Sequence, residues 1–249
     1  MEIIMIWIIE NDFVKKYRLK GSLKALERVR EQISEEAYSR LKELVRYRLY
    51  GEEFRRTKLN EEIVVAFSGG SDSTATVLGL RWAGFKVTPV TVKLPQMKEA
   101  KIKRLKKFGA VFIEVEDYGQ IMLDRVKKRA TLCGVCHSLI MESVERYARE
   151  NGVKIVASGD MLSVGNLSIY PKNDVVMLNF PAFLAMDKGE LIDIIGGVYT
   201  FHFGCPVLRN AYKSNRSLKL FSIQRVMREL RAGVLTEDMA KELILDILS

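Results

Sequence analysis

The chain has 249 residues, enough for one large or two small domains, and a hydrophobic content of 48% supports a sizeable buried core. The formal net charge of +9, from 40 Lys and Arg against 31 Asp and Glu, favours a polyanionic partner, although thermophile-like compositions reach the same balance without one. Three cysteines are too few for a disulfide scaffold, and no stretch is long enough to span a bilayer.

Residues 1–60 differ in pattern from the rest and form the first predicted region. The apolar run Ile3–Ile9 predicts a strand or a buried anchor, because it lacks the basic start and the cleavage site of a signal peptide. Helices are expected over Leu23–Ile33 and Glu35–Tyr50, with Ser34 capping the second. They form either a lid or dimer arm, or a nucleic-acid arm. The second interpretation would use Arg46, Arg48, Arg55, Arg56 and Lys58.

From Glu62 onward, strand and helix patterns alternate. Strands are expected at 62–67, 86–92, 110–115 and 153–158, and helices at 72–83, 96–108 and 136–151. This alternation predicts βαβ units and a parallel sheet in a core domain over 61–213. The helices should end at Gly84, Gly109 and Gly152.

The first predicted strand leads into a Gly-rich turn, followed by a predicted helix. The turn consists of Ser68, Gly69, Gly70, Ser71, Asp72 and Ser73. Free backbone N–H groups and the positive end of a helix dipole make such a turn an anion site. Asp72 is suited to a phosphate site only if a divalent cation lies between the two anions.

This turn resembles the SGGxDS loop of the PP-loop ATP pyrophosphatase superfamily, and the resemblance extends over roughly Ile63 to Leu230. The resemblance implies an α/β fold, a PP-loop parallel sheet with helices on both faces, here with N-terminal and C-terminal helical extensions. It implies that the loop holds the β,γ-pyrophosphate of ATP, with Mg²⁺ near Asp72. It also implies adenylation of a carbonyl oxygen with release of pyrophosphate.

Two other predicted strand ends should open on the same crevice, because ligands lie outside the carboxyl ends of parallel strands. Backbone groups of Val92 are placed to meet an adenine ring, and Gly159 permits close approach to a nucleotide. The family commonly has Gly-His here, whereas this chain has Asp160 after the glycine. Asp160 is either a ligand of magnesium or ribose, or an ordinary turn residue.

The last part of the chain is predicted to be mainly helical. Asp187 and Glu190 form a capping-box pattern for a helix at 188–195. The region 214–249 is expected to hold two helices that break at Ala232-Gly233, with Thr236 capping the second.

Cys133 and Cys136 open the predicted 136–151 helix, and Cys205 follows later. A C-x-x-C pair at a helix start is a metal, redox or disulfide motif. A structural zinc site needs four ligands, which only the adjacent His137 could complete. Three thiolates on an iron–sulfur cluster would leave one iron open for an exogenous ligand.

Together, loop and cysteines resemble the iron–sulfur-dependent tRNA thiolation enzymes, the two-thiouridine synthetases and their cytidine-thiolating relatives. The resemblance implies that Cys133, Cys136 and Cys205 hold a 4Fe-4S cluster whose open iron carries the sulfur. It also implies tRNA and a sulfur donor (sulfide or a sulfur-carrier protein) as partners, and a homodimer. Some relatives instead use a cysteine persulfide without a cluster, with Cys205 and one of the pair catalytic. The chain lacks the cysteine-rich zinc modules of the two-thiouridine branch.

The expected function is therefore ATP-dependent insertion of sulfur at an adenylated carbonyl group of a tRNA base, with Asp72 and Cys205 as catalytic residues and a cytoplasmic location. Two other classes stay open: a PP-loop enzyme acting on a small molecule (sulfur insertion, or an amide- or amidine-forming ligase) and a non-enzymatic nucleotide- and metal-binding regulator. Two sets of cations favour RNA. The first is Lys98, Lys101, Lys103, Arg104, Lys106 and Lys107; the second is Arg209, Lys213, Arg216, Lys219, Arg225, Arg228 and Arg231.

Overall fold

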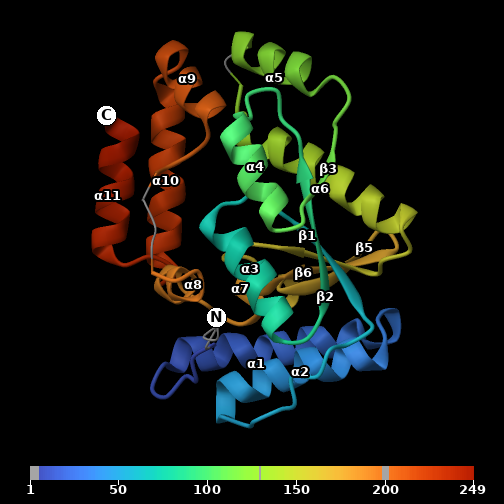
Figure 1. Cartoon of the computed structure of the whole chain (residues 1–249). Helices are drawn as coiled ribbons and strands as arrows, with labels where there is room; N and C mark the ends of the chain where they lie inside the picture. The colour runs from blue at the N-terminus through green and yellow to red at the C-terminus, as the bar shows by residue number, and fades with distance from the viewer. Residues whose placement is uncertain (1–5, 129, 198–201) are drawn as a thin grey trace.

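The computed structural model describes residues 6–128, 130–197 and 202–249 (Figure 1). Within these residues, six strands form one sheet in the order β3-β2-β1-β4-β6-β5. All neighbouring strands run parallel except β5, which is antiparallel to β6. The strands are β1 (Glu62–Ala66), β2 (Lys86–Val92), β3 (Val111–Ile113), β4 (Ile155–Ser158), β5 (Ile169–Lys172) and β6 (Val175–Asn179). The predicted α/β class with a mostly parallel sheet is confirmed.

Helices cover both faces of this sheet. Successive residues of a strand point to opposite faces, and both faces of β1 are apolar and buried. Ile63 and Val65 join a large cluster with the helices of one face, whereas Val64 joins a smaller cluster with the long helix α6. On these two faces lie α1 (Phe13–Arg28), α2 (Glu35–Tyr50), α3 (Ser71–Trp82), α6 (Cys133–Glu150), α7 (Phe180–Phe183) and α8 (Lys188–Ile194).

The strand order reverses next to β1. The chain passes from β1 through α3 to β2 on one side, and later returns through α6 to β4 on the other. In open α/β sheets this reversal leaves a crevice at the carboxyl ends of the central strands, which is where ligands bind. The helices α4 (Glu99–Lys107) and α5 (Tyr118–Lys127) lie between these two crossovers in the sequence.

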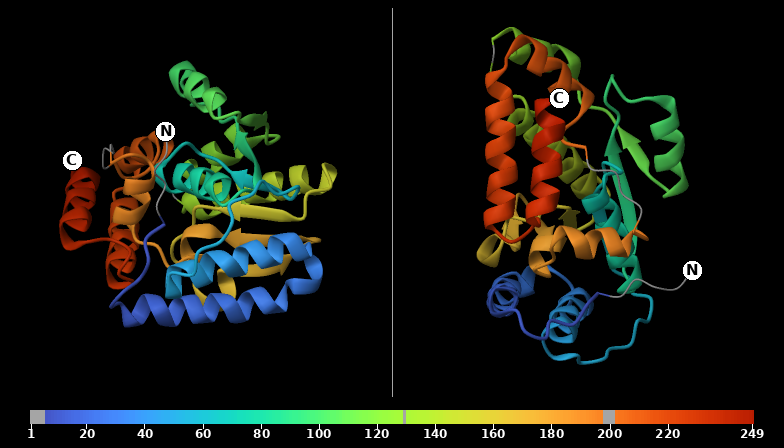
Figure 2. Two further views of the ribbon diagram at one scale, coloured as in Figure 1. Left: turned by 60° about the horizontal axis from the view of Figure 1, so that its bottom comes forward. Right: turned by 90° about the vertical axis from the view of Figure 1, so that its left-hand side faces the viewer.

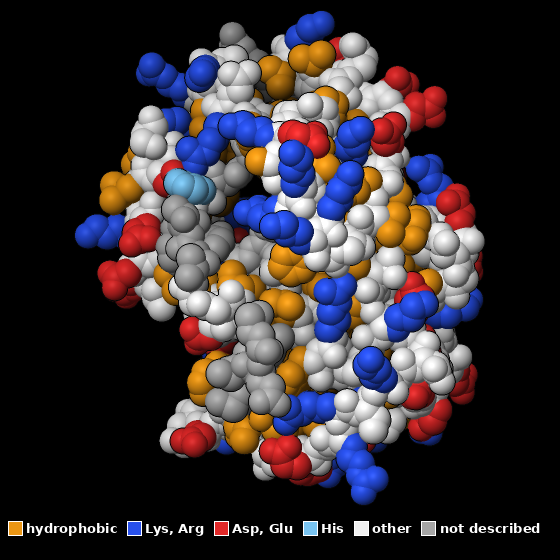
Figure 3. Space-filling view, in the orientation of Figure 1, with side chains coloured by type: hydrophobic (Ala, Val, Ile, Leu, Met, Phe, Trp, Pro, Cys, Tyr) orange, Lys and Arg blue, Asp and Glu red, His pale blue; other side chains and the backbone are white. Residues whose placement is uncertain are grey.

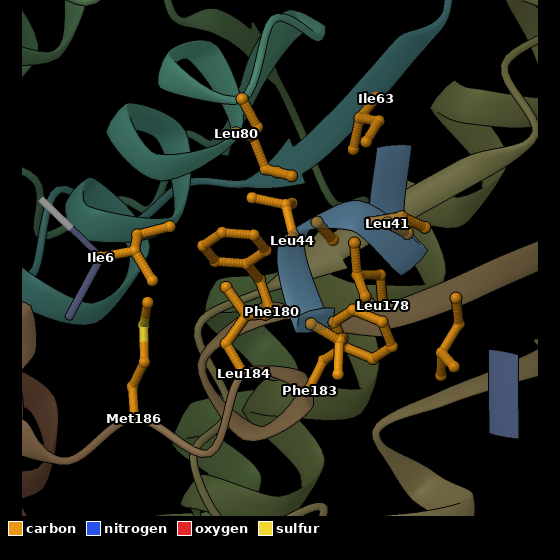
Figure 4. Packing of buried hydrophobic residues seen from close by; sticks show 14 of the residues in the cluster. Ile6, Leu41, Leu44, Ile63, Leu80, Leu178, Phe180, Phe183, Leu184 and Met186 are labelled. Carbon is orange, nitrogen blue, oxygen red and sulfur yellow. The ribbon is translucent and has the colours of Figure 1, made fainter. Parts of the chain in front are cut away.

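The N-terminal helices share their core with the sheet. Leu41 and Leu44 of α2 pack in the same buried cluster as Ile63 and Phe180 (Figure 4). Ile6 and Ile9 are also buried, but residues 6–9 form no strand, which supports the buried-anchor interpretation. Ile3, where that predicted strand begins, lies outside the described residues. The division into regions 1–60, 61–213 and 214–249 stays a prediction.

Two predictions for this region are wrong. The helix expected over Leu23–Ile33 starts at Phe13, where the Asp12 side chain accepts the Lys15 N–H as an N-cap, and it ends at Arg28 before a short 3-10 turn at Arg30–Gln32. Arg48 is fully buried and hydrogen-bonded, so it cannot contact nucleic acid.

The C-terminal helices form a layer of their own beside the sheet. They are α9 (Pro206–Ser214), α10 (Ser217–Arg231) and α11 (Glu237–Leu248), and α10 and α11 lie side by side (Figure 2). They bury a separate apolar cluster around Val226. The predicted break at Ala232-Gly233 and the Thr236 cap are confirmed. In the described part of the chain, no helix is both long and apolar enough to cross a membrane.

Candidate functional site

The turn Ser68–Ser73 lies at the carboxyl end of β1, at the reversal of strand order. Gly70 stands as the N-cap of α3 and no side chain caps the helix, so its first N–H groups face the turn without an intrahelical partner. The Ser73 hydroxyl lies 3.1 Å from that of Ser68 and 3.2 Å from the Gly70 carbonyl oxygen, to which it donates. These bonds shape an anion cradle at the positive end of the α3 dipole.

Two glycines of the prediction are required by close packing. Gly69 has a φ of 70°, and a Cβ there would lie 2.4 Å from Leu105 of α4. A Cβ on Gly159, at the end of β4, would lie 2.9 Å from the carbonyl carbon of Asp72 and from the Ser73 nitrogen. Gly159 therefore lets β4 approach the backbone of the turn itself. This contact is with the protein, whereas the sequence interpretation assigned the approach to a nucleotide.

Lys188 is a site residue that the sequence interpretation missed. It is the first residue of α8, and its Nζ lies 2.5 Å from Oδ1 of Asp72 and 2.7 Å from the Ser71 hydroxyl. The Lys188 side chain is 10% exposed and that of Asp72 is 35% exposed. The turn thus combines a cation, a carboxylate and helix N–H groups, a set that suits a phosphate chain with a divalent cation.

A buried ion network holds the start of α8 in place. The Arg48 guanidinium, which is 0% exposed, donates to both carboxylate oxygens of Glu190 at 2.7 and 2.8 Å. Glu190 also completes the predicted capping box with Asp187, which is confirmed, and Lys15 binds both carboxylates. Two N-terminal helices therefore fix the residues that flank Lys188.

The structure places Val92 and Asp160 at the neighbouring strand ends. Val92 is the last residue of β2 and is buried. Oδ1 of Asp160 accepts the backbone N–H groups of Leu162 and Ser163, at 2.7 and 3.0 Å, as in an ordinary turn. The turn role of Asp160 is thus observed, and a ligand role stays a prediction.

The three cysteines lie at two helix starts. Cys133 is the first residue of α6, one turn before Cys136, and Cys205 is the N-cap of α9, followed by Pro206. Cys133 and Cys205 are exposed. The Tyr118 hydroxyl lies 3.1 Å from the Cys136 sulfur. Helix α6 begins three residues earlier than expected, and α5 and α9 had no counterpart in the prediction.

Electrostatic coupling shows that the three thiols share one neighbourhood. Desolvation by the surrounding protein, and then the charge of Cys205, raises the pKa of Cys133. Desolvation likewise raises the pKa of Cys136. The hydrogen bond with Tyr118 lowers this pKa in part, and the charge of Cys205 raises it further. Desolvation, followed by the Cys136 hydrogen bond, raises the pKa of Tyr118, which therefore stays protonated.

The donor set matches a thiolate-held cluster in type, since it consists of three cysteines with no carboxylate among them, and it would leave one iron of a four-iron cluster without a protein ligand. In the described part of the chain, however, no three Cys, His, Asp or Glu side chains are arranged as metal ligands. Ligation would therefore require the thiols to move toward one another.

Arg225 of α10 links the turn and the cysteines electrostatically, because it interacts with both Asp72 and Cys133. On the opposite side, burial followed by repulsion from Arg104 lowers the pKa of Lys101 of α4, and the charge of Cys205 opposes this shift. Lys and Arg side chains gather around a hollow between α4 and the C-terminal helices (Figure 3).

Comparison with known proteins finds one relative that matches nearly the whole chain and two that match part of it. The chain is 32% identical over 252 residues to a Methanocaldococcus jannaschii protein named Uncharacterized protein MJ1638, covering 96% of this chain and 95% of that protein. It is 26% identical to Uncharacterized protein MJ1599 of the same organism, covering 72% and 70% of the two chains. It is also 24% identical to a Thermococcus kodakarensis protein named Probable tRNA sulfurtransferase, covering 63% of this chain and 49% of that protein. No protein-family model matches the chain.

Proposed function

The chain belongs to the family of the Methanocaldococcus jannaschii protein MJ1638, and we propose that it is an ATP-dependent sulfurtransferase acting on a carbonyl group of a tRNA base. The observation that carries the proposal is the turn Ser68–Ser73 at the start of α3, where Lys188 lies 2.5 Å from Asp72, together with Arg225, which interacts electrostatically with both Asp72 and Cys133. The likeness to the Probable tRNA sulfurtransferase supports the sulfur chemistry and the RNA substrate, although the match spans about half of that protein, 49% of its length.

In the activation step, the phosphates of ATP lie against the start of α3. The N–H groups of Ser71–Ser73 and the Lys188 ammonium stabilise negative charge there, and Asp72 would hold Mg²⁺. The substrate carbonyl oxygen attacks the α-phosphorus. The bond from the α-phosphorus to the bridging oxygen breaks, and pyrophosphate leaves with that oxygen.

In the transfer step, sulfide attacks the adenylated carbon. A carbon–sulfur bond forms, the carbon–oxygen bond breaks, and AMP leaves with the substrate oxygen. Cys133, Cys136 and Cys205 would supply this sulfur, and their mutual electrostatic interactions support a common role. These thiolates would hold a 4Fe-4S cluster, which would supply an iron able to carry sulfide.

A cysteine persulfide is the alternative sulfur source. Cys205 would then deliver its outer sulfur and form a disulfide with Cys133 or Cys136, which an external dithiol must reduce in each cycle. Iron and acid-labile sulfide in the anaerobically purified protein would favour the cluster, whereas one turnover per protein without dithiol would favour the persulfide.

Two further contacts with the nucleotide are proposed at the ends of β2 and β4. The backbone of Val92, at the end of β2, would contact the adenine ring, and Gly159 and Asp160, just after β4, would face the ribose or Mg²⁺. Both contacts would be tested by ATP affinity in variants of these residues.

The proposal is tested by incubating the protein with unmodified tRNA, MgATP and sulfide, followed by mass spectrometry of the nucleosides. A nucleoside with oxygen replaced by sulfur is expected with the wild type, and none with Asp72→Asn or Cys205→Ser. The control is Ser163→Ala, whose side chain makes no hydrogen bond within the described residues. Full thiolation by Cys205→Ser protein would contradict the assigned role of the cysteines.

A further inference from the structure

A cavity lies among the C-terminal helices, lined by residues of α9, the start of α10 and the end of α11. It encloses about 610 Å³ and is lined by Arg209, Tyr212, Lys213, Arg216, Lys219 and Asp246, together with the last residues of the chain. Four of these six side chains are cationic and one is acidic. The reaction proposed above uses none of them.

The single acid of this set is already neutralised. Asp246 accepts hydrogen bonds from the Arg209 guanidinium and from the Phe203 backbone N–H. The Arg209 hydrogen bond, more than any other cause, holds the pKa of Asp246 at about 2, so its charge is paired at neutral pH. Lys219 donates to the Leu248 carbonyl oxygen at 2.8 Å.

Two cations remain unpaired in this cavity. Lys213 and Arg216 are exposed, and neither makes an ion pair within the described part of the chain. Positive charge without a carboxylate partner is the electrostatic feature of an anion-binding surface.

The helix α9 runs from Cys205, the proposed sulfur site, to this cavity. Cys205 caps its start, and Arg209 and Lys213 follow at intervals of four residues on one face. Leu208, Ala211 and Tyr212 occupy the buried face. At 1.5 Å per residue, Lys213 lies about 12 Å along the helix from Cys205.

We propose that this cavity binds the phosphates of one or two unpaired nucleotides of RNA, and that the base next to them then lies at Cys205. The inference rests on the proposed function and adds the RNA contact surface to it. A volume of about 610 Å³ suits a ligand of drug size, which corresponds to one or two nucleotides and excludes a duplex. Lys213 of α9 and Arg216 at the start of α10 place two available cations three residues apart, which favours two linked phosphates over an isolated anion.

The test uses the full-length protein, a fluorescent unpaired oligoribonucleotide without ATP, and anisotropy titrations at several KCl concentrations. Each phosphate contact to a single strand contributes about 0.7 to the salt slope, so the two contacts made by Lys213 and Arg216 predict about a sevenfold loss of affinity between about 50 and 200 mM KCl. The double variant Lys213→Gln, Arg216→Gln should lose nearly all of this salt dependence, because the other two cations of the cavity are held by Asp246 and by the Leu248 carbonyl oxygen.

The matched control is Lys20→Gln, Lys24→Gln. These two lysines are exposed on α1, which lies on the opposite side of the molecule from α9 (Figure 1). The control should keep the wild-type slope. The inference is overturned if the Lys213, Arg216 variant keeps that slope, if the wild type binds no RNA, or if a DNA duplex of equal charge binds equally well.

Thiolation by the same proteins separates this inference from the function on which it rests. If the wild type thiolates tRNA and the Lys213, Arg216 variant does so with an unchanged KM for tRNA, the cavity is not the RNA site, and the function stands. If no thiolation occurs but the salt slope depends on Lys213 and Arg216, the sulfurtransferase function fails, and the RNA site is supported.

Discussion

The substitution Glu190→Gln should destabilise the protein strongly, although it changes no shape. The carboxylate of Glu190 is 13% exposed and binds the fully buried Arg48 through two hydrogen bonds. Removing one partner of a buried ion pair costs about 3–5 kcal/mol because the other charge stays buried. We expect about 3 kcal/mol, since Arg48 keeps the carbonyl oxygens of Trp7 and Ala185 as acceptors.

For a chain of this size, that loss corresponds to a Tm lowered by about 6–12 °C. Thermal unfolding followed by circular dichroism measures it. The control is Glu52→Gln, because Glu52 makes a two-bond pair with Arg46 in which both side chains are nearly half exposed. The control should lose less than about 1 kcal/mol. Equal Tm values for the two variants would refute the reasoning that burial sets the cost.

Three further predictions concern Gly159, Lys188 and Asp246. Gly159→Ala should weaken ATP binding, measured by calorimetry, and destabilise the protein by about 1–3 kcal/mol, because its Cβ would overlap the backbone of Asp72. Lys188→Met should lower the rate of pyrophosphate release by about 100-fold, with partial recovery in Lys188→Arg; an unchanged rate would remove Lys188 from the phosphate site. The pKa of Asp246 is about 2 in the native state and about 4 when unfolded, so its stabilising contribution is present above about pH 4 and lost as pH falls toward 2. Urea unfolding of Asp246→Asn should therefore depend less on pH in that window than the wild type, and parallel curves would contradict this.

Local patterns were sufficient to predict the central sheet. The strands β1, β2, β3 and β4 fall within the predicted ranges, because runs rich in β-branched residues with Gly or Pro nearby on at least one side are a short-range signal. The β5–β6 hairpin was missed. Its turn, Asn173-Asp174, has φ values of 46° and 65°, a geometry in which Asn and Asp are common, so a signal for it was present.

The site depends on contacts that no local pattern specifies. Lys188 and Asp72 are 116 residues apart, and Arg48 and Glu190 are 142 apart, so only the folded chain brings them together. One indirect signal existed for Lys188. A cation in the first turn of a helix interacts unfavourably with the helix dipole, so an acidic partner outside the helix is expected to compensate for it. For Arg48 no such signal existed, because Arg46, Arg55 and Arg56 around it are equally basic in the sequence.

The most direct test of the central claim is the product balance of ATP cleavage during thiolation of tRNA, followed by ³¹P NMR. Attack on the α-phosphorus predicts one AMP and one pyrophosphate for each sulfur atom incorporated, with neither formed in Asp72→Asn protein. Formation of ADP and phosphate, or thiolation without ATP cleavage, would contradict the account.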